Sequence, residues 1–384
     1  MRRLNLAILA LALGAFGIGV TEFTPMGILP LIAHDFDISI PTAGIMISAY
    51  ALGVMIGAPL MTLTTGSIPR RTLLIGMVAI FTLGNLLSAI SINYSMLLIS
   101  RVITSLNHGA FFGVGSVVAA SLVPAHRRAT AISAMFMGLT FANVIGVPLA
   151  TWTGEVTGWR AAFWGISVIG LVTMAALWKT LPAMPVPVGS NVLAELSVLL
   201  SRPVLAALGL TVLSSSAMFT VFTYIVPMLL NVTQASTFFV TSMFVTYGIG
   251  LTVGNWIGGK FTDRYPVRTL TLSLVAVVVT LLLFALLLPY ALPTAALIFL
   301  WGVASFAVMP PLQMRVMTAA QHAPSLASSV NIGAFNLGNA IGAALGGAVI
   351  TAGLTYRFVA VAGAVTAALG LLMLSLMNKS SSEP

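Results

Sequence analysis

The chain has 384 residues, of which 59% are hydrophobic and 6% are charged. Soluble domains carry roughly 25% charged residues. This composition therefore excludes a water-soluble protein and predicts a membrane protein, in which lipid surrounds most of the surface. The chain has no cysteine, which excludes disulfides, thiol catalysis and cysteine-ligated metals. The net charge of +9 has two explanations, which are binding to nucleic acid and an excess of basic residues in cytoplasmic loops.

The chain contains a series of apolar segments. Each is close in length to the roughly 20 residues that a helix needs to cross a bilayer. We predict twelve spans, at 5–32, 42–63, 72–92, 95–122, 129–150, 160–181, 204–230, 237–258, 269–288, 292–317, 325–350 and 358–377. The segments are too long and too uniformly apolar for barrel strands. We therefore predict an all-α membrane protein, with a six-helix bundle over 1–181, a cytoplasmic linker over 182–203 and a second bundle over 204–384. Pro25 and Pro30, together with the length of the first segment, favour a retained span over a signal peptide.

The basic residues predict how the chain is oriented. With the N-terminus inside, thirteen Lys and Arg residues fall on the cytoplasmic side, and only Arg160 and Arg357 fall outside. Cytoplasmic loops carry such an excess, so both termini are predicted to be cytoplasmic. The same asymmetry accounts for the net charge, and we expect no nucleic-acid partner.

The two halves repeat at an offset of 196 or 197 residues. The matching pairs are Gly53 and Gly250, Gly57 and Gly254, Arg71 and Arg268, His126 and His322, Asn143 and Asn339, Gly146 and Gly342, and Arg160 and Arg357. Six spans separate the members of each pair, so both halves start on the same side. A parallel repeat of this kind predicts a transporter built from two bundles, with a site near the midplane between them.

Four segments resemble one transporter family. These segments are "TEFTPMGILPLIAHDFDIS" (21–39), "AGIMISAYALGVMIGAPL" (43–60), "SRVITSLNHGAFFG" (100–113) and "MPPLQMRVM" (309–317). They are similar to the drug:proton antiporter and sugar-efflux branch of the major facilitator superfamily, and most similar to its arabinose-efflux-permease-like members. The resemblance implies a monomeric, proton-coupled antiporter of the bacterial inner membrane. It implies export by alternating access of a small organic solute, which is a sugar or sugar analogue, a nucleoside, or an amphiphilic drug as in multidrug resistance. It implies no cofactor and no metal.

Three family motifs can be placed on this sequence. The loop motif between spans eight and nine is present as Gly259, Asp263, Arg264 and Arg268, whereas its first-half counterpart keeps only Arg70 and Arg71. The resemblance implies a cytoplasmic latch, and plain topology charges are the alternative. The antiporter motif of span five resembles Gly138, Gly146-Val147-Pro148 and Gly154, in which the small residues favour close helix packing and the proline favours a bend. The intramembrane Arg101 of span four corresponds to the third motif, which implies a role in proton coupling.

Apart from Arg160, Lys179 and Arg315 within three residues of span ends, Glu22 and Arg101 are the only charged residues inside the predicted spans. An ionisable group at membrane depth is costly unless it serves a cavity or a partner, so we expect Glu22 to exchange a proton. His108, in the same span as Arg101, could relay that proton or bind the hydroxyl groups of a sugar. Each residue also has a structural alternative. Glu22 could be a carboxylate bonded to a neighbouring helix, Arg101 could reach the outer interface, and His108 could be a packing residue.

Amide and aromatic side chains supply a candidate substrate cavity. Asn331 and Asn339 share a face of span eleven, Asn336 is partly aligned with them, and Asn143 matches Asn339 by the repeat. Such amides suit hydroxylated substrates, and bonding between helices is the alternative. The remaining candidates are Tyr50, Asn107, Phe111, Phe136, Phe219, Phe222, Tyr247 and Phe306.

Other functions find less support. The segment "GNWIGGKF" (254–261) matches the start of a phosphate-binding loop, but Phe261 occupies the position of the Mg²⁺-binding hydroxyl. The sequence has neither H-E-x-x-H nor G-x-S-x-G, so we expect no enzyme. The repeat speaks against a channel. A proton-independent facilitator or importer of the same solutes stays open, because it would share the architecture.

Overall fold

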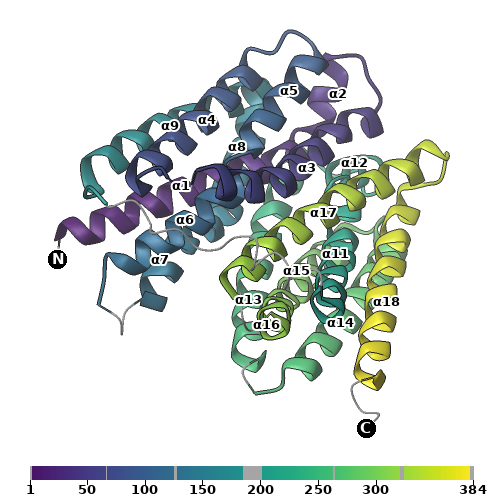
Figure 1. Ribbon diagram of the computed structural model, residues 1–384. Coiled ribbons are helices and arrows are strands. Elements are labelled where there is room, and N and C mark those ends of the chain that lie inside the picture. Colours follow the sequence, from purple (N-terminus) through teal and green to yellow (C-terminus); the bar gives the residue numbers. More distant parts are fainter. Residues whose placement is uncertain are drawn as a thin grey trace. The chain divides into compact units, whose positions relative to one another are not determined.

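The computed structural model describes residues 2–65, 67–124, 128–184, 201–262, 264–320 and 324–380, and the regular structure in these ranges is helical (Figure 1). Twelve helical stretches of the described residues are long and apolar enough to cross a membrane. They coincide with the predicted spans to within a few residues at most ends, which confirms the predicted fold class. The helices form because apolar segments in lipid must satisfy every backbone polar group internally.

The described residues cluster into two compact units. One comprises the described residues within 1–32 and 49–184, and the other comprises those within 33–48 and 201–380. Helix α3 (Ile40–Thr64) therefore contributes to both units. Residues 185–200, the greater part of the predicted linker, lie outside the described residues, so the division at 182–203 stays a prediction.

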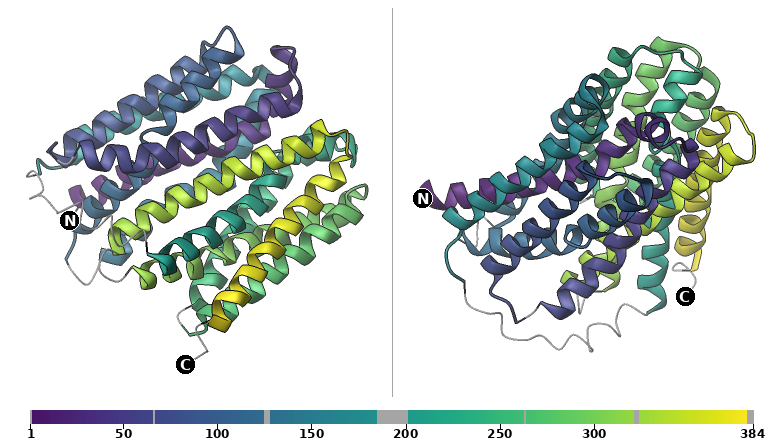
Figure 2. Two further views of the ribbon diagram at one scale, coloured as in Figure 1. Left: turned by 45° about the vertical axis from the view of Figure 1, so that its right-hand side comes forward. Right: turned by 90° about the horizontal axis from the view of Figure 1, so that it is seen from above.

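The first half of the chain forms the following helices besides α3: α1 (Arg2–Gly27), α2 (Leu29–Asp35), α4 (Arg70–Ala89), α5 (Tyr94–Ser105), α6 (His108–Ser121), α7 (Arg128–Phe141), α8 (Val147–Thr157) and α9 (Trp159–Thr180). The second half forms α11 (Arg202–Phe222), α12 (Ile225–Asn231), α13 (Thr237–Thr262), α14 (Pro266–Leu287), α15 (Ala291–Ala307), α16 (Met309–Ala319), α17 (Pro324–Thr351) and α18 (Tyr356–Ser380). Figure 2 shows α11, α17 and α18 side by side.

Four spans consist of two helices each, at equivalent places in the two halves. Spans one and seven divide into α1 and α2 and into α11 and α12, and spans four and ten divide into α5 and α6 and into α15 and α16. Pro30 follows the first division and Pro310 follows the last. Proline removes a backbone donor and obstructs the preceding turn, which accounts for these two breaks. In transporters, broken spans of this kind occur beside binding sites.

Span five changes its helical pitch in place of a break. Residues Ala142–Gly146 form a π-helical turn between α7 and α8, and the amide of Val147 donates to the carbonyl of Ala142, five residues earlier. Pro148 lies in the first turn of α8. A widened turn accommodates the proline ring, which would otherwise clash with the turn before it. The proline of the antiporter motif therefore acts through a π-bulge.

The internal repeat is visible in the packing of each half. Helix α1 packs on α7 in the first half as α11 packs on α17 in the second, and α4 packs on α9 as α14 packs on α18. Gly250 and Gly254 lie against the backbone of α15, while their counterparts Gly53 and Gly57 lie against Ser105 and Leu106 at the end of α5. Small residues at these positions let the helix backbones approach closely.

A seam of three glycines joins span five to span one. Gly138, Gly146 and Gly154 are eight residues apart, and they face Ala12, Val20 and Ile28, which are also eight apart. A methyl group at Gly138 would collide with the carbonyl oxygen of Ala12. The glycines of the antiporter motif therefore set the distance between α1, which carries Glu22, and span five.

We expect Gly138→Ala to lower the free energy of unfolding by about 1–3 kcal/mol, because α1 must move away from α7 to admit the methyl group. Gly76→Ala in α4 is the matched control, since a methyl group there would meet nothing within 4 Å. Thermal unfolding of both variants in the same detergent measures the difference. Equal midpoints for the two variants would show that the seam tolerates a wider spacing.

Candidate functional site

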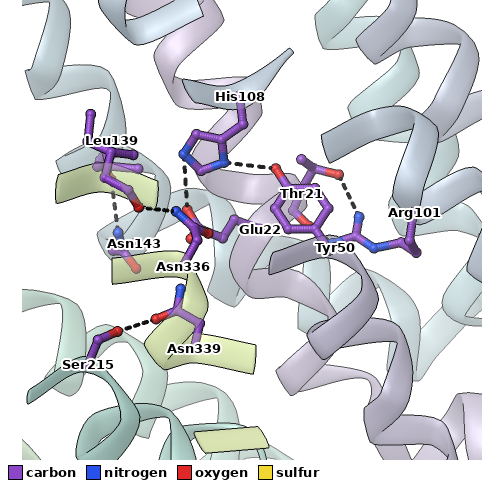
Figure 3. A network of polar contacts seen from close by, with 11 residues as sticks. Thr21, Glu22, Tyr50, Arg101, His108, Leu139, Asn143, Ser215, Asn336 and Asn339 are labelled. Carbon is purple, nitrogen blue, oxygen red and sulfur yellow. Dashed lines mark hydrogen bonds and ion pairs between the residues drawn. The ribbon is translucent and has the colours of Figure 1, made fainter. Parts of the chain in front are cut away.

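A polar network connects four helical segments inside the first unit (Figure 3). Thr21 and Glu22 come from α1, Tyr50 from α3, Arg101 from α5 and His108 from α6. All five side chains are buried, with at most 7% of each residue exposed. The structure therefore brings together the three predicted proton-coupling residues, Glu22, Arg101 and His108.

Pro25 explains why Arg101 lies where it does. In a regular helix the carbonyl of Thr21 accepts a hydrogen bond from the amide of residue 25, but proline has no amide hydrogen. Arg101 supplies the missing donor, with Nη2 2.9 Å from the Thr21 carbonyl oxygen and Nη1 3.1 Å from Oγ1 of Thr21. Thr21 in turn donates to Oδ1 of Asn85 at 2.5 Å. A backbone gap in α1 thus becomes the binding site for a buried guanidinium.

The ring of Tyr50 lies between the two charged parts of the network. The guanidinium carbon of Arg101 is 4.2 Å from the centre of the Tyr50 ring, a cation–π contact. The Tyr50 hydroxyl is 3.1 Å from Nδ1 of His108. Arg101 is completely buried, so its guanidinium is enclosed by protein and does not reach the surface of the described chain. Tyr50, which the sequence offers as a candidate for the substrate cavity, thus makes a cation–π contact and a hydroxyl contact inside this network.

His108 faces the carboxylate of Glu22. Nε2 of His108 is 3.9 Å from Oε2 of Glu22, which is an ion-pair distance but too long for a hydrogen bond. In one tautomer Nδ1–H donates to the Tyr50 oxygen and the unprotonated Nε2 faces Glu22 as an acceptor, whereas in the other the Tyr50 hydroxyl donates to Nδ1 and Nε2–H points toward Glu22. A small rotation of either side chain, or one bridging hydroxyl, would complete the connection. The arrangement therefore places a carboxyl group and an imidazole nitrogen next to each other inside the first unit.

The other first-half candidates divide into two groups. Asn107 ends the break between α5 and α6 and donates to the carbonyl of Met77, and the ring of Phe111 packs under Gly14 of α1. These two residues support the fold. Phe136 belongs to an aromatic row that leads to the network, because it stacks on Phe112, whose ring centre is 5.3 Å from that of His108. Asn143 donates to the carbonyl of Leu139 within its own span.

The amides of span eleven mostly join helices of the second unit. Asn331 accepts from Thr211 of α11 and donates to Gln313 of α16, both at 2.7 Å. Asn339 accepts a short hydrogen bond from Ser215 of α11. The alternative of helix–helix bonding therefore describes both residues. Asn336 differs from them, since its Oδ1 is buried and accepts no hydrogen bond from the described residues.

An aromatic cluster is the second feature of this unit. Phe222 stacks on Tyr247 with ring centres 4.8 Å apart, and Tyr247 lies 4.7 Å from Trp301. These three rings line a small cavity of about 10 Å³, close to the volume that one water needs. Phe219 packs edge-on against Phe222, and Phe306 is half-buried on α15. Trp301 is not among the residues predicted from the sequence to line the cavity. The feature of the sequence that could have identified it is an indole N–H group in a span with few polar residues.

Three polar atoms near these rings are buried without partners. The indole Nε1 of Trp301, the hydroxyl of Tyr247 and the hydroxyl of Ser305 make no hydrogen bond with the described residues. The two hydroxyls lie near each other, outside ordinary hydrogen-bond geometry. Buried tyrosine and tryptophan usually find a polar partner. The aromatic cluster therefore offers donors and acceptors to a further molecule.

The loop-motif residues have separate surroundings. Arg71 donates to the carbonyl of Trp178 at 2.5 Å, so it caps the C-terminal end of α9, and no hydrogen bond of the Arg70 side chain is found in the described residues. Arg264 lies over Tyr265, and Arg268 is exposed. A side chain at Gly259 would meet nothing, whereas Gly258 abuts Ala307. Asp263 lies outside the described residues, so the latch stays a prediction.

Comparison with known proteins agrees with this architecture. The family model "Major Facilitator Superfamily" matches residues 11–332. The chain is 54% identical to the inner membrane transport protein YdhP of Escherichia coli strain K12, over 99% of this chain and 98% of that protein. It is 31% identical to a probable sugar efflux transporter of Helicobacter pylori strain P12, over 96% of this chain and 93% of the other. The resemblance inferred from the motifs is thereby confirmed.

A solved structure shows the same fold. The xylose transporter XylE of E. coli, in a partially occluded inward open conformation, superimposes with a TM-score of 0.74 at 15% identity, covering 97% of each chain. At that identity the likeness concerns the fold alone. The family match extends over most of the chain, and the relatives align along nearly their full length. This protein belongs to the major facilitator superfamily of membrane transporters.

Proposed function

We propose that this transporter is a proton-coupled antiporter of the bacterial inner membrane that exports a small organic solute. The observation that carries the proposal is the buried carboxylate of Glu22, held within reach of His108 and near the fixed charge of Arg101. The relatives named as transport proteins support transport in general, and the one named as a sugar efflux transporter supports export of a hydroxylated solute. Both termini are cytoplasmic in this proposal, and the bundles 1–181 and 204–384 are its moving parts.

Glu22 is the proton carrier in this scheme. A proton that enters from outside neutralises the carboxylate, and a neutral carboxyl is the form that a buried site tolerates best. After the conformational change the proton leaves toward the cytoplasm, with His108 as the relay. The negative charge that then remains on Glu22 is offset by Arg101 and favours substrate binding.

The energy available to one proton is sufficient for export. Moving one charge through 100 mV supplies about 2.3 kcal/mol, and one pH unit adds about 1.4 kcal/mol. Together they support a concentration ratio of roughly several hundredfold for a neutral solute. In this scheme no nucleotide is consumed.

Arg101 acts as a positioning residue in this proposal. Its two hydrogen bonds hold Thr21 and thereby fix the turn of α1 that carries Glu22. The cation–π contact in turn places Tyr50, which orients His108. A single guanidinium thus sets the geometry of both proton-exchanging groups.

The aromatic cluster is the proposed substrate surface of the second bundle. Sugars and nucleosides present a flat or apolar ring face together with hydroxyl groups. Tyr247 and Trp301 offer the ring faces, and their unpartnered O–H and N–H groups together with Ser305 suit the hydroxyls. The apolar lining also suits an amphiphilic drug, so the choice between these solutes depends on whether the polar atoms are used.

We expect Glu22→Gln to abolish transport driven by a pH gradient while substrate exchange without a gradient continues, because the amide cannot release a proton. Proteoliposomes with an imposed pH gradient and a panel of sugars, nucleosides and drugs measure both modes. Glu155→Gln is the matched control, since Glu155 is a half-buried acid outside the network. If the pH gradient does not change transport by the wild type, the protein is a facilitator. If the Glu22→Gln variant still transports in response to the gradient, Glu22 is not the proton carrier.

We expect Trp301→Phe to raise the KM of the solute identified in that panel roughly tenfold, since one buried hydrogen bond is worth about 1–3 kcal/mol when its partner is left unpaired. The phenyl ring keeps a ring contact with Tyr247, and because Trp301 is completely buried, the smaller side chain should also lower thermal stability, which is measured alongside KM. Trp152→Phe is the control, because Trp152 is 53% exposed. An unchanged KM in Trp301→Phe would remove the indole from the substrate surface.

We expect Arg101→Gln to lower the free energy of unfolding by about 1–3 kcal/mol, because the Thr21 carbonyl loses its donor in a buried setting. Adding Pro25→Ala to that variant should recover part of the loss by restoring the helical amide. Adding Pro30→Ala should not, since its amide would serve a different carbonyl. Thermal unfolding of the three variants in detergent measures the recovery. Equal recovery by both proline changes would contradict the conclusion that Arg101 replaces the amide missing at Pro25.

A further inference from the structure

A cavity of about 580 Å³ lies at one end of the second unit, away from the aromatic cluster. It is bounded by the N-terminal parts of α11 and α14, by α16 from Pro311 to its C-terminal end, and by the last turn of α18. Its walls are largely apolar, and Pro203, Leu270, Met314 and Met377 contribute to them. Its volume is within the range of small-molecule sites.

Two arginines give this cavity its charge. Arg202 and Arg315 both line it, and the lining residues from the described part of the chain include no acidic side chain. Arg202 is exposed in the first turn of α11, where a cation is unfavourable for the helix dipole. Arg315 is half-buried, and the one hydrogen bond found for its guanidinium in the described residues is a long one, 3.4 Å, to Asn378. The arginines therefore keep donors available for an anion.

The position of the cavity identifies the kind of anion. The four helix ends that surround it are ends of membrane spans, so the cavity lies at the depth of the lipid headgroups. In the proposed orientation this is the cytoplasmic leaflet, where anionic lipids interact with basic residues. Two guanidiniums match the oxygens of a phosphodiester, and the apolar walls match an acyl chain.

We propose that this cavity binds one anionic phospholipid of the cytoplasmic leaflet, with its phosphate between Arg202 and Arg315 and an acyl chain along the apolar walls. The bound lipid would join the ends of four helices in the second half. The proposal depends on the orientation of the chain in the membrane and is independent of proton coupling at Glu22.

The test compares lipids on the purified full chain in detergent. Phosphatidylglycerol, added in place of phosphatidylcholine, should raise the unfolding midpoint of the wild type, and native mass spectrometry should show one retained phosphatidylglycerol. The double variant Arg202→Gln and Arg315→Gln should lose both effects. The single variant Arg202→Gln changes an exposed residue and should lose most of the phosphatidylglycerol-dependent rise in the unfolding midpoint. It replaces the double variant in the test if the double variant does not fold.

A second double variant controls for unspecific charge. Lys260→Gln with Arg264→Gln removes two exposed cations from the same half and the same predicted face, so it should keep the full phosphatidylglycerol shift. Equal loss in both double variants would overturn the site in favour of general surface attraction. A midpoint shift of the same size with inorganic phosphate alone would overturn the lipid assignment in favour of a small-anion site. Persistence of the bound lipid in Arg202→Gln with Arg315→Gln would also overturn it.

Discussion

The hydrogen bonds from Arg101 to Thr21 are the interaction on which the first half of this transporter depends. Lipid supplies no partner for a free carbonyl or for a charged guanidinium, and each is costly alone. Pro25 creates the free carbonyl, and Arg101 satisfies it with two donors. Because the residue after Thr21 is Glu22, the same contact fixes the position of the buried acid. A local backbone defect thus determines where a functional group lies.

The two halves share their packing but differ in their chemistry. Equivalent helix pairs pack in both, and glycines mark several of the close approaches. The first half carries the charged network around Glu22, whereas the second carries amides that join helices and an aromatic cluster around Trp301. We infer a division of labour in which the first half handles the proton and the second half contributes to holding the solute.

The glycine seam links the motif in span five to the acid in span one. Gly138 lies against the backbone of α1, Gly146 and Gly154 lie against the side chains of Val20 and Ile28, and the π-helical turn lets Pro148 fit into the same span. Close packing of this kind transmits displacement, because interiors at native density have little room to absorb it. A shift of span five would therefore move the turn of α1 that carries Glu22.

Sequence alone determined the class, the twelve spans and the family, because bilayer thickness and hydropathy act on each segment separately. It also identified Glu22, Arg101 and His108 as the buried ionisable groups, since charges are rare at membrane depth. Only the tertiary structure decided their partners, which come from four helical segments far apart in the chain. For the same reason Asn331 and Asn339 turned out to bond α11, and Trp301 emerged from its ring contacts. Hydropathy specifies what must be buried, and packing geometry specifies against which neighbour.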